Sequence, residues 1–334
     1  MFALKGISTG TRVAILSETQ SRPVLIHLSE LAAYDLAAEF CLIQMPTPPQ
    51  TAPVPVKSTG TSWAIQGNRA MIEALKPRDI IVDCTVEGII RAPEWPEIEA
   101  AGRTRLLVIT NERPEIPERT EPRAEHGPKL QLGIWMPREA SEMRVTSAIG
   151  TDLTVDLQGA PCGGTAGFGT TLGLVAHWPG GLCLAFPGKE AVNGRTVMAV
   201  GDVNLTFTTC LTGLIDFTIK ADFVTEIRGD ELDALHLREY MAAWDDRNPY
   251  GLSHVGWGMN PAARWVSTAM YDKRDMQAVE FQALAGSFLW STGANQYAGR
   301  FTQGHFDLPM RGCTIALDGR VVVLADVLQG ELAG

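Results

Sequence analysis

Three segments rich in glycine and tryptophan carry the histidines that could do chemistry. They are HWPGG around His177, YGLSHVGWGMNP around His254, and QGHFDLPM, which holds His305 and Asp307. Glycine lets the backbone approach a ligand closely, and functional side chains are often carried by such turns. The histidines that we interpret as solvated or structural lie in helical or charged segments: His27, His126 and His236.

His305 and Asp307 are two residues apart, so on a strand their side chains point to the same face. They could supply two ligands to one metal ion, and His254 is the natural third. Two histidines and one carboxylate are typical of non-haem Fe(II) oxygenases. The alternative is that Asp307 only caps the turn at Leu308-Pro309, because HxD pairs also arise by chance. The sequence contains neither HExxH nor a zinc-finger cluster.

The chemistry explains why such a set would be open. Three ligands leave coordination positions where O2 and an ionised substrate hydroxyl can bind side by side. Electron density can then pass from an electron-rich ring through iron to oxygen. A closed site with four protein ligands, as in structural zinc sites, could not do this.

The composition excludes several classes of partner. The chain has 334 residues and a formal net charge of −10, from 28 basic and 38 acidic residues, without a basic cluster for nucleic acid. No apolar run reaches the roughly 18–20 residues that span a bilayer, and the N-terminus lacks a signal-peptide pattern. The six scattered cysteines indicate reduced thiols rather than disulfides. We therefore expect a cytoplasmic protein without a membrane or nucleic-acid partner.

Residues 1–110 alternate strand-like and helix-like patterns. Such alternation is typical of a parallel sheet, so we predict a small doubly wound α/β domain. No GxGxxG follows the first strand, which argues against a dinucleotide site. The predicted strands are 12–16, 41–45, 79–84 and 105–110, and the predicted helices are 27–40 and 64–75.

A segment rich in proline and charge, residues 111–145, is predicted to contain some helix and to connect this domain to a metal-binding catalytic domain at 146–334. There, alternating polar and apolar residues favour half-buried antiparallel strands, and an Asp-Gly dipeptide predicts a hairpin turn within 314–324. The fold class is therefore α/β plus α+β. The predicted strands are 151–157, 183–186, 196–200 and 215–219. A helix is predicted at 230–244, with an apolar side formed mostly by Leu232, Leu235, Tyr240, Met241 and Trp244.

The strings YGLSHVGWGMNPAARW and FLWSTGANQYAGRFTQGHFDLPMRGCTIALDGRVVVL resemble the C-terminal part of the 2,5-dihydroxypyridine 5,6-dioxygenase family. The resemblance is dense over residues 177–327 and weaker before them. Those enzymes open a pyridine ring in microbial nicotinic acid degradation, and they are similar in fold to the M29 leucyl aminopeptidases of the aminopeptidase T type. The resemblance implies this fold, Fe(II) as cofactor, a small aromatic substrate with O2, and a homo-oligomer.

The resemblance also assigns residues. It implies His254, His305 and Asp307 as iron ligands and His177 as the acid/base, a role that suits an imidazole. The chain departs from the family at two places. Thr165 replaces a glutamate twelve positions before His177, and Thr85-Val86-Glu87-Gly88 replaces an N-terminal-domain histidine, so Glu87 is a candidate substitute for that base or simply a solvated carboxylate.

Other side chains flank the candidate ligands and could stack on an aromatic ring, hydrogen-bond it, or pair with a substrate carboxylate. For the tryptophans the alternative is a place in the core, and for the arginines an ion pair with a neighbour. These substrate-binding candidates are Trp257, Trp290, Ser291, Thr292, Arg264 and Arg311, beside Thr165 and Glu87.

The predicted function is an Fe(II)-dependent, extradiol-type dioxygenase that opens a hydroxylated N-heteroaromatic ring. The alternative is a metal-dependent hydrolase that uses a metal-activated water. M29 peptidases need further ligands, including a tyrosine shortly after the histidine that matches His254, but this chain has Pro261-Ala262-Ala263 there. A third hypothesis is a non-catalytic relative, against which the intact three-residue set argues.

Overall fold

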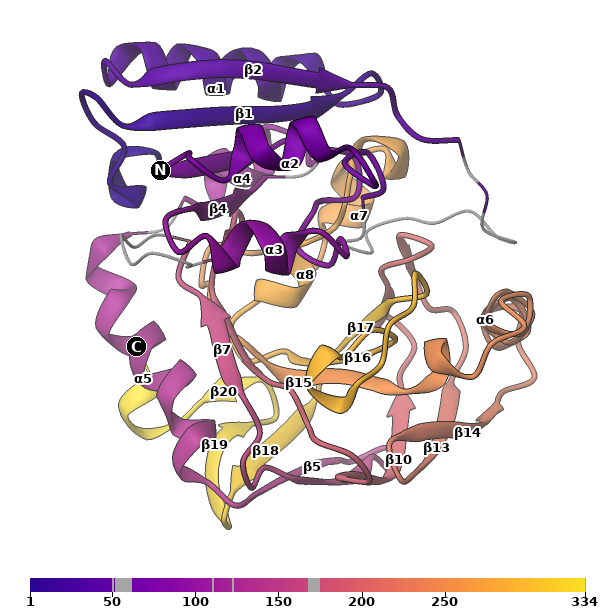
Figure 1. Ribbon diagram of the computed structural model, residues 1–334. Helices are drawn as coiled ribbons and strands as arrows, with labels where there is room; N and C mark the ends of the chain where they lie inside the picture. The colour runs from indigo at the N-terminus through magenta and orange to yellow at the C-terminus, as the bar shows by residue number, and fades with distance from the viewer. Residues whose placement is uncertain (50, 52–61, 110, 122, 168–174, 334) are drawn as a thin grey trace.

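The computed structural model describes residues 1–49, 51, 62–109, 111–121, 123–167 and 175–333. A unit built on a parallel sheet lies above a larger unit of antiparallel sheets (Figure 1). In the described part of the chain, no helix is long and apolar enough to cross a membrane. All six cysteines are free thiols, as predicted.

The five-stranded parallel sheet has the order β2-β1-β3-β4-β8. Its central strands are apolar on both sides because helices cover both faces. Helix α1 packs on one face, and α2 and α3 pack on the other. This arrangement confirms the predicted doubly wound domain. The elements are β1 (Arg12–Glu18), α1 (Pro23–Asp35), β2 (Glu39–Met45), α2 (Arg69–Leu75), β3 (Ile80–Asp83), α3 (Trp95–Ala100), β4 (Arg105–Val108) and β8 (Val175–His177).

The fifth strand of this sheet corrects the simple division into 1–110 and 146–334. Strand β8 pairs in parallel with β4, so residues 175–177 belong to the parallel sheet although they follow the connecting segment. The described residues of that segment, 111–121 and 123–145, contain secondary structure of their own. They include α4 (Glu115–Arg119), α5 (Gly127–Glu139) and the start of β5 (Glu142–Ser147).

The second unit is largely antiparallel, as predicted. Its sheets have the orders β14-β13-β10-β6-β5-β18-β19-β20 and β17-β16-β15-β9-β7, beside a pair β11-β12. The remaining strands are β6 (Asp152–Asp156), β7 (Cys162–Thr165), β9 (Leu182–Ala185), β10 (Val192–Met198), β11 (Val203–Asn204), β12 (Thr209–Cys210), β13 (Ile215–Lys220), β14 (Phe223–Arg228), β15 (Leu252–Gly258), β16 (Phe288–Thr292), β17 (Phe306–Met310), β18 (Cys313–Leu317), β19 (Arg320–Leu324) and β20 (Val327–Leu328).

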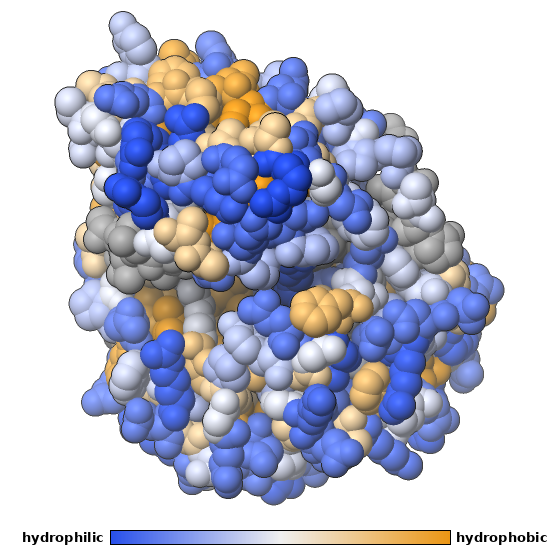
Figure 2. Space-filling view, in the orientation of Figure 1, coloured by the Kyte–Doolittle hydropathy of each residue, from blue (hydrophilic) through white to orange (hydrophobic). Residues whose placement is uncertain are grey.

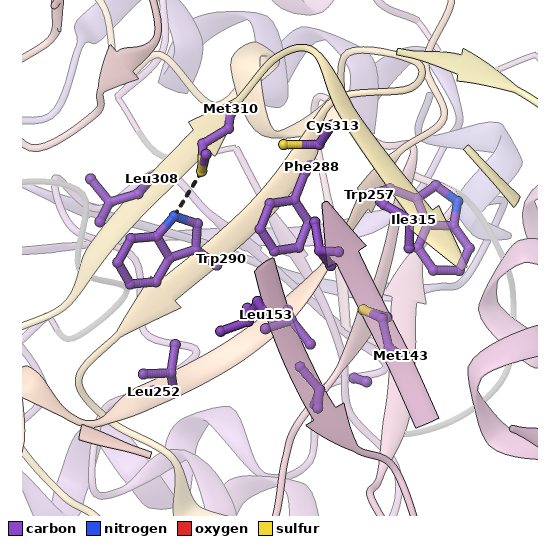
Figure 3. Close-up of a cluster of buried hydrophobic side chains, with 14 of the residues drawn as sticks. Met143, Leu153, Leu252, Trp257, Phe288, Trp290, Leu308, Met310, Cys313 and Ile315 are labelled. Carbon is purple, nitrogen blue, oxygen red and sulfur yellow. Dashed lines mark hydrogen bonds between the residues drawn. The ribbon is translucent and has the colours of Figure 1, made fainter. Parts of the chain in front are cut away.

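A continuous apolar core fills the space between the two large sheets (Figure 3). Phe217 of β13 meets Trp290 of β16 edge to face, with 4.9 Å between ring centroids. Aromatic pairs in this geometry stabilise a core beyond their buried area. The sheet that carries the candidate ligands therefore rests on a rigid support.

The other helices are short: α6 (Leu232–Ala242), α7 (Ser267–Met270) and α8 (Glu280–Ala283), with 3₁₀ turns at Ala3–Lys5, Ala124–His126, Asn248–Tyr250, Lys273–Asp275, Gln296–Ala298 and Gly330–Leu332. The predicted apolar side of α6 was partly wrong. Leu232 and Leu235 are exposed, and the buried positions are Ala234, Leu237 and Met241. The predicted hairpin is confirmed, because Asp318 and Gly319 join β18 to β19 with positive φ of 46° and 82°.

Two glycines explain part of the SHVGWG string on β15. A Cβ added at Gly256 would collide with the backbone carbonyl of Cys183 on β9, and one at Gly258 would collide with that of Leu284. The backbone of neighbouring segments therefore lies directly against β15. Only a residue without a side chain fits at these two positions.

We expect Gly256→Ala to lower the free energy of unfolding by about 2 kcal/mol or more, because overpacking against backbone cannot relax easily. Thermal unfolding followed by circular dichroism measures the effect. Gly163→Ala on β7 of the same sheet is the matched control, since no atom lies within 4 Å of its added Cβ. Equal melting temperatures for the two variants would contradict this account of β15.

Candidate metal centre

Two strands of the antiparallel sheet β17-β16-β15-β9-β7 bring three potential metal ligands together. His254 lies on β15, and Asp307 lies on β17 with His305 just before it. Asp307 Oδ1 is 3.4 Å from His254 Nε2 and 3.3 Å from His305 Nε2. One ligand atom from each residue lies within 4.8 Å of the others. The HxD pair thus does more than cap a turn.

The strand between them makes this approach possible. In β16, Ser291 is in register with Asp307 and donates or accepts a hydrogen bond at 2.8 Å from His254 Nδ1. The register between β15 and β16 shifts between Leu252 and Val255, at the position of His254. Such bulges re-aim side chains next to functional sites.

Asp307 fits the role of an ionised ligand. Its Oδ2 accepts a hydrogen bond of 2.8 Å from Gln282 Nε2. Its Oδ1 is buried, and no described residue donates an aligned hydrogen bond to it. Burial alone would raise the pKa of Asp307, but the nearby His305 and His254 hold it well below its usual range. A buried carboxylate oxygen that faces two imidazole nitrogens without a hydrogen bond is what a bound cation would satisfy.

The two histidines are held neutral, which is the form that binds a metal. Burial lowers the pKa of His305 to about 4, and it also lowers the pKa of His254. A metal on Nε2 leaves the proton on Nδ1, which then needs an acceptor. For His254 that acceptor is Ser291 Oγ.

Sequence reasoning missed Arg91, which reaches this site from the parallel-sheet unit. Its Nη1 donates to Ser253 Oγ at 3.0 Å and to the Ala294 carbonyl at 2.9 Å. The guanidinium also lies 3.0 Å from His305 Nδ1 and 3.3 Å from His254 Nδ1. Burial lowers the pKa of Arg91 to about 10, so it stays charged at neutral pH.

The carboxyl end of β3 shapes the loop that delivers Arg91. Asp83 accepts hydrogen bonds from Thr85 N, Thr85 Oγ1 and Ile89 N. These bonds close the turn over Thr85–Ile89, just before Arg91. Arg91 is the one basic residue between Arg78 and Arg103 and follows the segment where the family histidine was expected, so this isolated charge was a signal.

His177 stands at the carboxyl end of β8 and faces the same region. Burial lowers its pKa to about 4, and the charges of Arg91, Asp307 and His254 also act on it. Thr165 Oγ1 accepts hydrogen bonds from His177 N at 2.8 Å and from Gly167 N at 3.1 Å. Thr165 therefore holds the backbone of His177, a different task from the predicted substrate contact.

Glu87 is half buried on the loop that follows β3. Its carboxylate lies close enough to Tyr240 of α6 to help burial raise the pKa of that phenol. Glu87 thus faces the second unit. Its predicted role as a substitute base stays a prediction.

Two of the pocket candidates, Trp257 and Trp290, point into the core (Figure 3). Trp257 and Trp290 are fully buried there, and Trp290 Nε1 donates to Met310 Sδ at 3.2 Å. Thr292 alternates with Ser291 on β16 and so lies on the side of Trp290. Side chains alternate between the two faces of a strand, so Ser291, which contacts His254, lies on the opposite face of β16 from Trp290 and Thr292.

The two candidate arginines lie away from the ligands. Arg311 is half exposed and pairs with Asp326 at 3.2 Å, and Arg264 is exposed. Arg311 thus matches the alternative interpretation, an ion pair with a neighbour. The cation at the site is Arg91.

Comparison with known proteins extends the resemblance over both units. The family model described as "NicX: 2,5-dihydroxypyridine 5,6-dioxygenase" matches residues 1–330. A 2,5-dihydroxypyridine 5,6-dioxygenase of Pseudomonas putida KT2440 is 32% identical over 326 residues, which cover 96% of this chain and 91% of the relative.

Solved structures agree with this match. The 2,5-dihydroxypyridine dioxygenase of Pseudomonas putida KT2440 superposes with a TM-score of 0.93 and 30% identity, covering 100% of this chain and 96% of that one. AmpT from Thermus thermophilus superposes with a TM-score of 0.62 and 14% identity, covering 97% of each chain, and shows the predicted aminopeptidase T-like fold. The chain belongs to the 2,5-dihydroxypyridine 5,6-dioxygenase family.

Proposed function

We propose that this protein is a non-haem Fe(II)-dependent dioxygenase that opens a hydroxylated N-heteroaromatic ring of the dihydroxypyridine kind. The observation that carries the proposal is the buried set of His254, His305 and Asp307, in which Asp307 Oδ1 faces both imidazoles without an aligned hydrogen bond. Membership of a family described as ring-cleaving dioxygenases supports the reaction class.

The donor set favours iron. Two imidazoles and one carboxylate suit Fe(II) with open positions, and when bound the ion would supply a place where O2 and the substrate hydroxyl meet. Gln282 and Ser291 would fix the orientation of Asp307 and His254, as outer partners of metal ligands commonly do.

His177 is the proposed base. A pKa lowered to about 4 keeps its imidazole neutral at physiological pH, so it can accept the proton of the substrate hydroxyl. His177 ends β8 and lies close enough to Asp307 and His254 for their charges to act on it, which supports this role. His177 can then give this proton to the ring-opened product, which restores its own neutral imidazole.

Arg91 is the proposed charge that favours an anionic substrate. It stays protonated, is partly exposed, and lies next to both candidate histidine ligands. A substrate ring that loses a proton to His177 becomes negatively charged, and the nearby guanidinium of Arg91 would stabilise that charge. Arg91 lies four residues after Glu87, close to the region where the resemblance led us to expect a histidine, so this chain offers a positive charge there.

We expect Asp307→Asn to weaken Fe(II) binding by more than about 100-fold, because even the outer partners of metal ligands contribute about 10–100-fold. Anaerobic titration calorimetry measures the affinity. Asp152→Asn, which removes an exposed carboxylate on β6, is the control.

Reconstituted wild type should consume O2 with at least one hydroxypyridine in a panel that includes dihydroxybenzenes. No O2 uptake with any ring, together with Mn- or Zn-dependent amide hydrolysis, would favour the hydrolase instead.

His177→Asn should lower kcat by about 10²–10⁴-fold, the usual contribution of a positioned base. Its Fe(II) affinity should stay at the wild-type value, because His177 is outside the ligand set. Comparison of O2-uptake rates with the titrated affinity separates the two effects. A variant that keeps wild-type kcat would remove His177 from the reaction.

Arg91→Gln should separate metal binding from turnover. A guanidinium beside His305 Nδ1 opposes a nearby cation, whereas the Gln carbonyl can accept the Nδ1 proton, so Fe(II) should bind at least as tightly. Loss of the positive charge should raise the pKa of His177, which lies near 4 in the wild type. The acid limb of kcat/KM should therefore move to higher pH. Arg91→Lys is the matched control that retains the charge, and its acid limb should stay near that of the wild type. Identical acid limbs for the Gln variant and the wild type would contradict the assigned coupling.

A further inference from the structure

Apolar side chains are exposed together on helix α1 and strand β2, far from the candidate metal centre. We name this region the α1/β2 surface and define it by Val24, Leu28, Leu31, Tyr34, Phe40 and Leu42, all of them exposed. Figure 2 shows apolar residues gathered at the top of the molecule, where α1 and β2 lie in Figure 1.

Helix α1 is apolar on two opposite sides. Leu25, Ile26 and Ala33 pack on the parallel sheet. Val24, Leu28 and Leu31 recur at helical spacing on the other side and face solvent, with Leu31 52% exposed. An apolar side of a helix is normally buried against another element, and no described residue of this chain covers the outer side of α1.

Strand β2 adds an unpaired edge to the same region. It is the end strand of the parallel sheet and pairs only with β1 among the described strands. Phe40 and Leu42 alternate with residues that pack on the α2 and α3 side, so they project to the face of α1, which contacts β2. A seven-residue edge strand with exposed apolar side chains is a template for pairing with another chain.

We propose that a second copy of this chain docks on the α1/β2 surface about a two-fold axis perpendicular to the parallel sheet. Such an axis pairs β2 antiparallel with the β2 of the copy and joins the two parallel sheets into one sheet of twice the width. It also brings the two α1 helices next to each other on the same face. One symmetry operation thus covers both the strand edge and the apolar helix.

The distribution of charge favours a copy in this orientation. The acidic residues Asp35 and Glu39 lie at one end of the surface, where α1 ends and β2 begins, whereas nearer the start of α1 the acidic Glu30 has His27 beside it at 3.8 Å. Antiparallel docking keeps the acidic ends of the two copies apart. It places each acidic end near the amino-terminal end of the partner's α1, where the helix dipole is positive. Parallel docking would bring like charges together in a chain of net charge −10.

Docking here would leave the candidate metal centre intact. Strand β8, which carries His177, is at the opposite edge of the same sheet from β2. The proposal is therefore independent of the proposed reaction, and its test does not involve catalysis.

The test is the mass of the full chain in solution, measured by sedimentation equilibrium over micromolar concentrations. Wild type should be a dimer or a larger assembly built from dimers, and Leu31→Glu should weaken this association by at least about 100-fold, since two charges are buried per dimer. Leu324→Glu is the matched control, because Leu324 is 51% exposed on β19, outside the surface. It should associate like the wild type.

Hydrogen exchange provides a second measurement for the same proteins. Amides of β2 should exchange more slowly in the wild type and Leu324→Glu than in Leu31→Glu, while circular dichroism and Fe(II) affinity stay equal in all three. A monomeric wild type would overturn the proposal. Undiminished association of Leu31→Glu, or equal loss in both variants, would overturn it as well.

Discussion

The structure depends on one electrostatic constraint, the burial of an ionised carboxylate between two neutral imidazoles. Asp307 is 6% exposed, and both histidines are 4% exposed. Leaving a charge in such surroundings is costly unless partners compensate it. Gln282 compensates one oxygen, and the other is left facing the imidazole nitrogens. The rest of the second unit, from the Trp290 core to the glycines of β15, keeps these three side chains from relaxing apart.

The convergence of His254, His305 and Asp307 could be predicted from sequence because it depends on local rules. His305 and Asp307 share a face through the strand period, and the glycine-rich surroundings of His254 marked the third position. The same period puts Ser291 and Trp290 on opposite faces of β16. The sequence alone does not say which of these faces meets the candidate ligands. Spacing therefore placed both in the pocket, whereas the observed register sends Trp290 into the core.

The missed features are long-range. Arg91 contacts residues more than 160 positions away, and such a contact arises only when the carboxyl edge of the parallel sheet meets the antiparallel sheet. The place of β8 was missed for a related reason, since a three-residue strand carries too little pattern to reveal which sheet it joins. Thr165 illustrates a third limit, because a hydroxyl near a catalytic residue can serve the backbone of that residue instead of the substrate.

The route of the chain between β8 and β9 has a mechanical consequence. Only residues 178–181 separate the strand that carries His177 from the sheet that carries His254. Asn260 donates from Nδ2 to the Gly180 carbonyl at 2.9 Å, and Gly181 accepts a hydrogen bond from Met259 N at 2.7 Å. This short, hydrogen-bonded crossing ties the carboxyl end of β8, which carries His177, directly to the sheet that carries His254. Since Arg91 is also hydrogen-bonded to Ser253 and Ala294, the two units are fastened to each other on both sides of the candidate site.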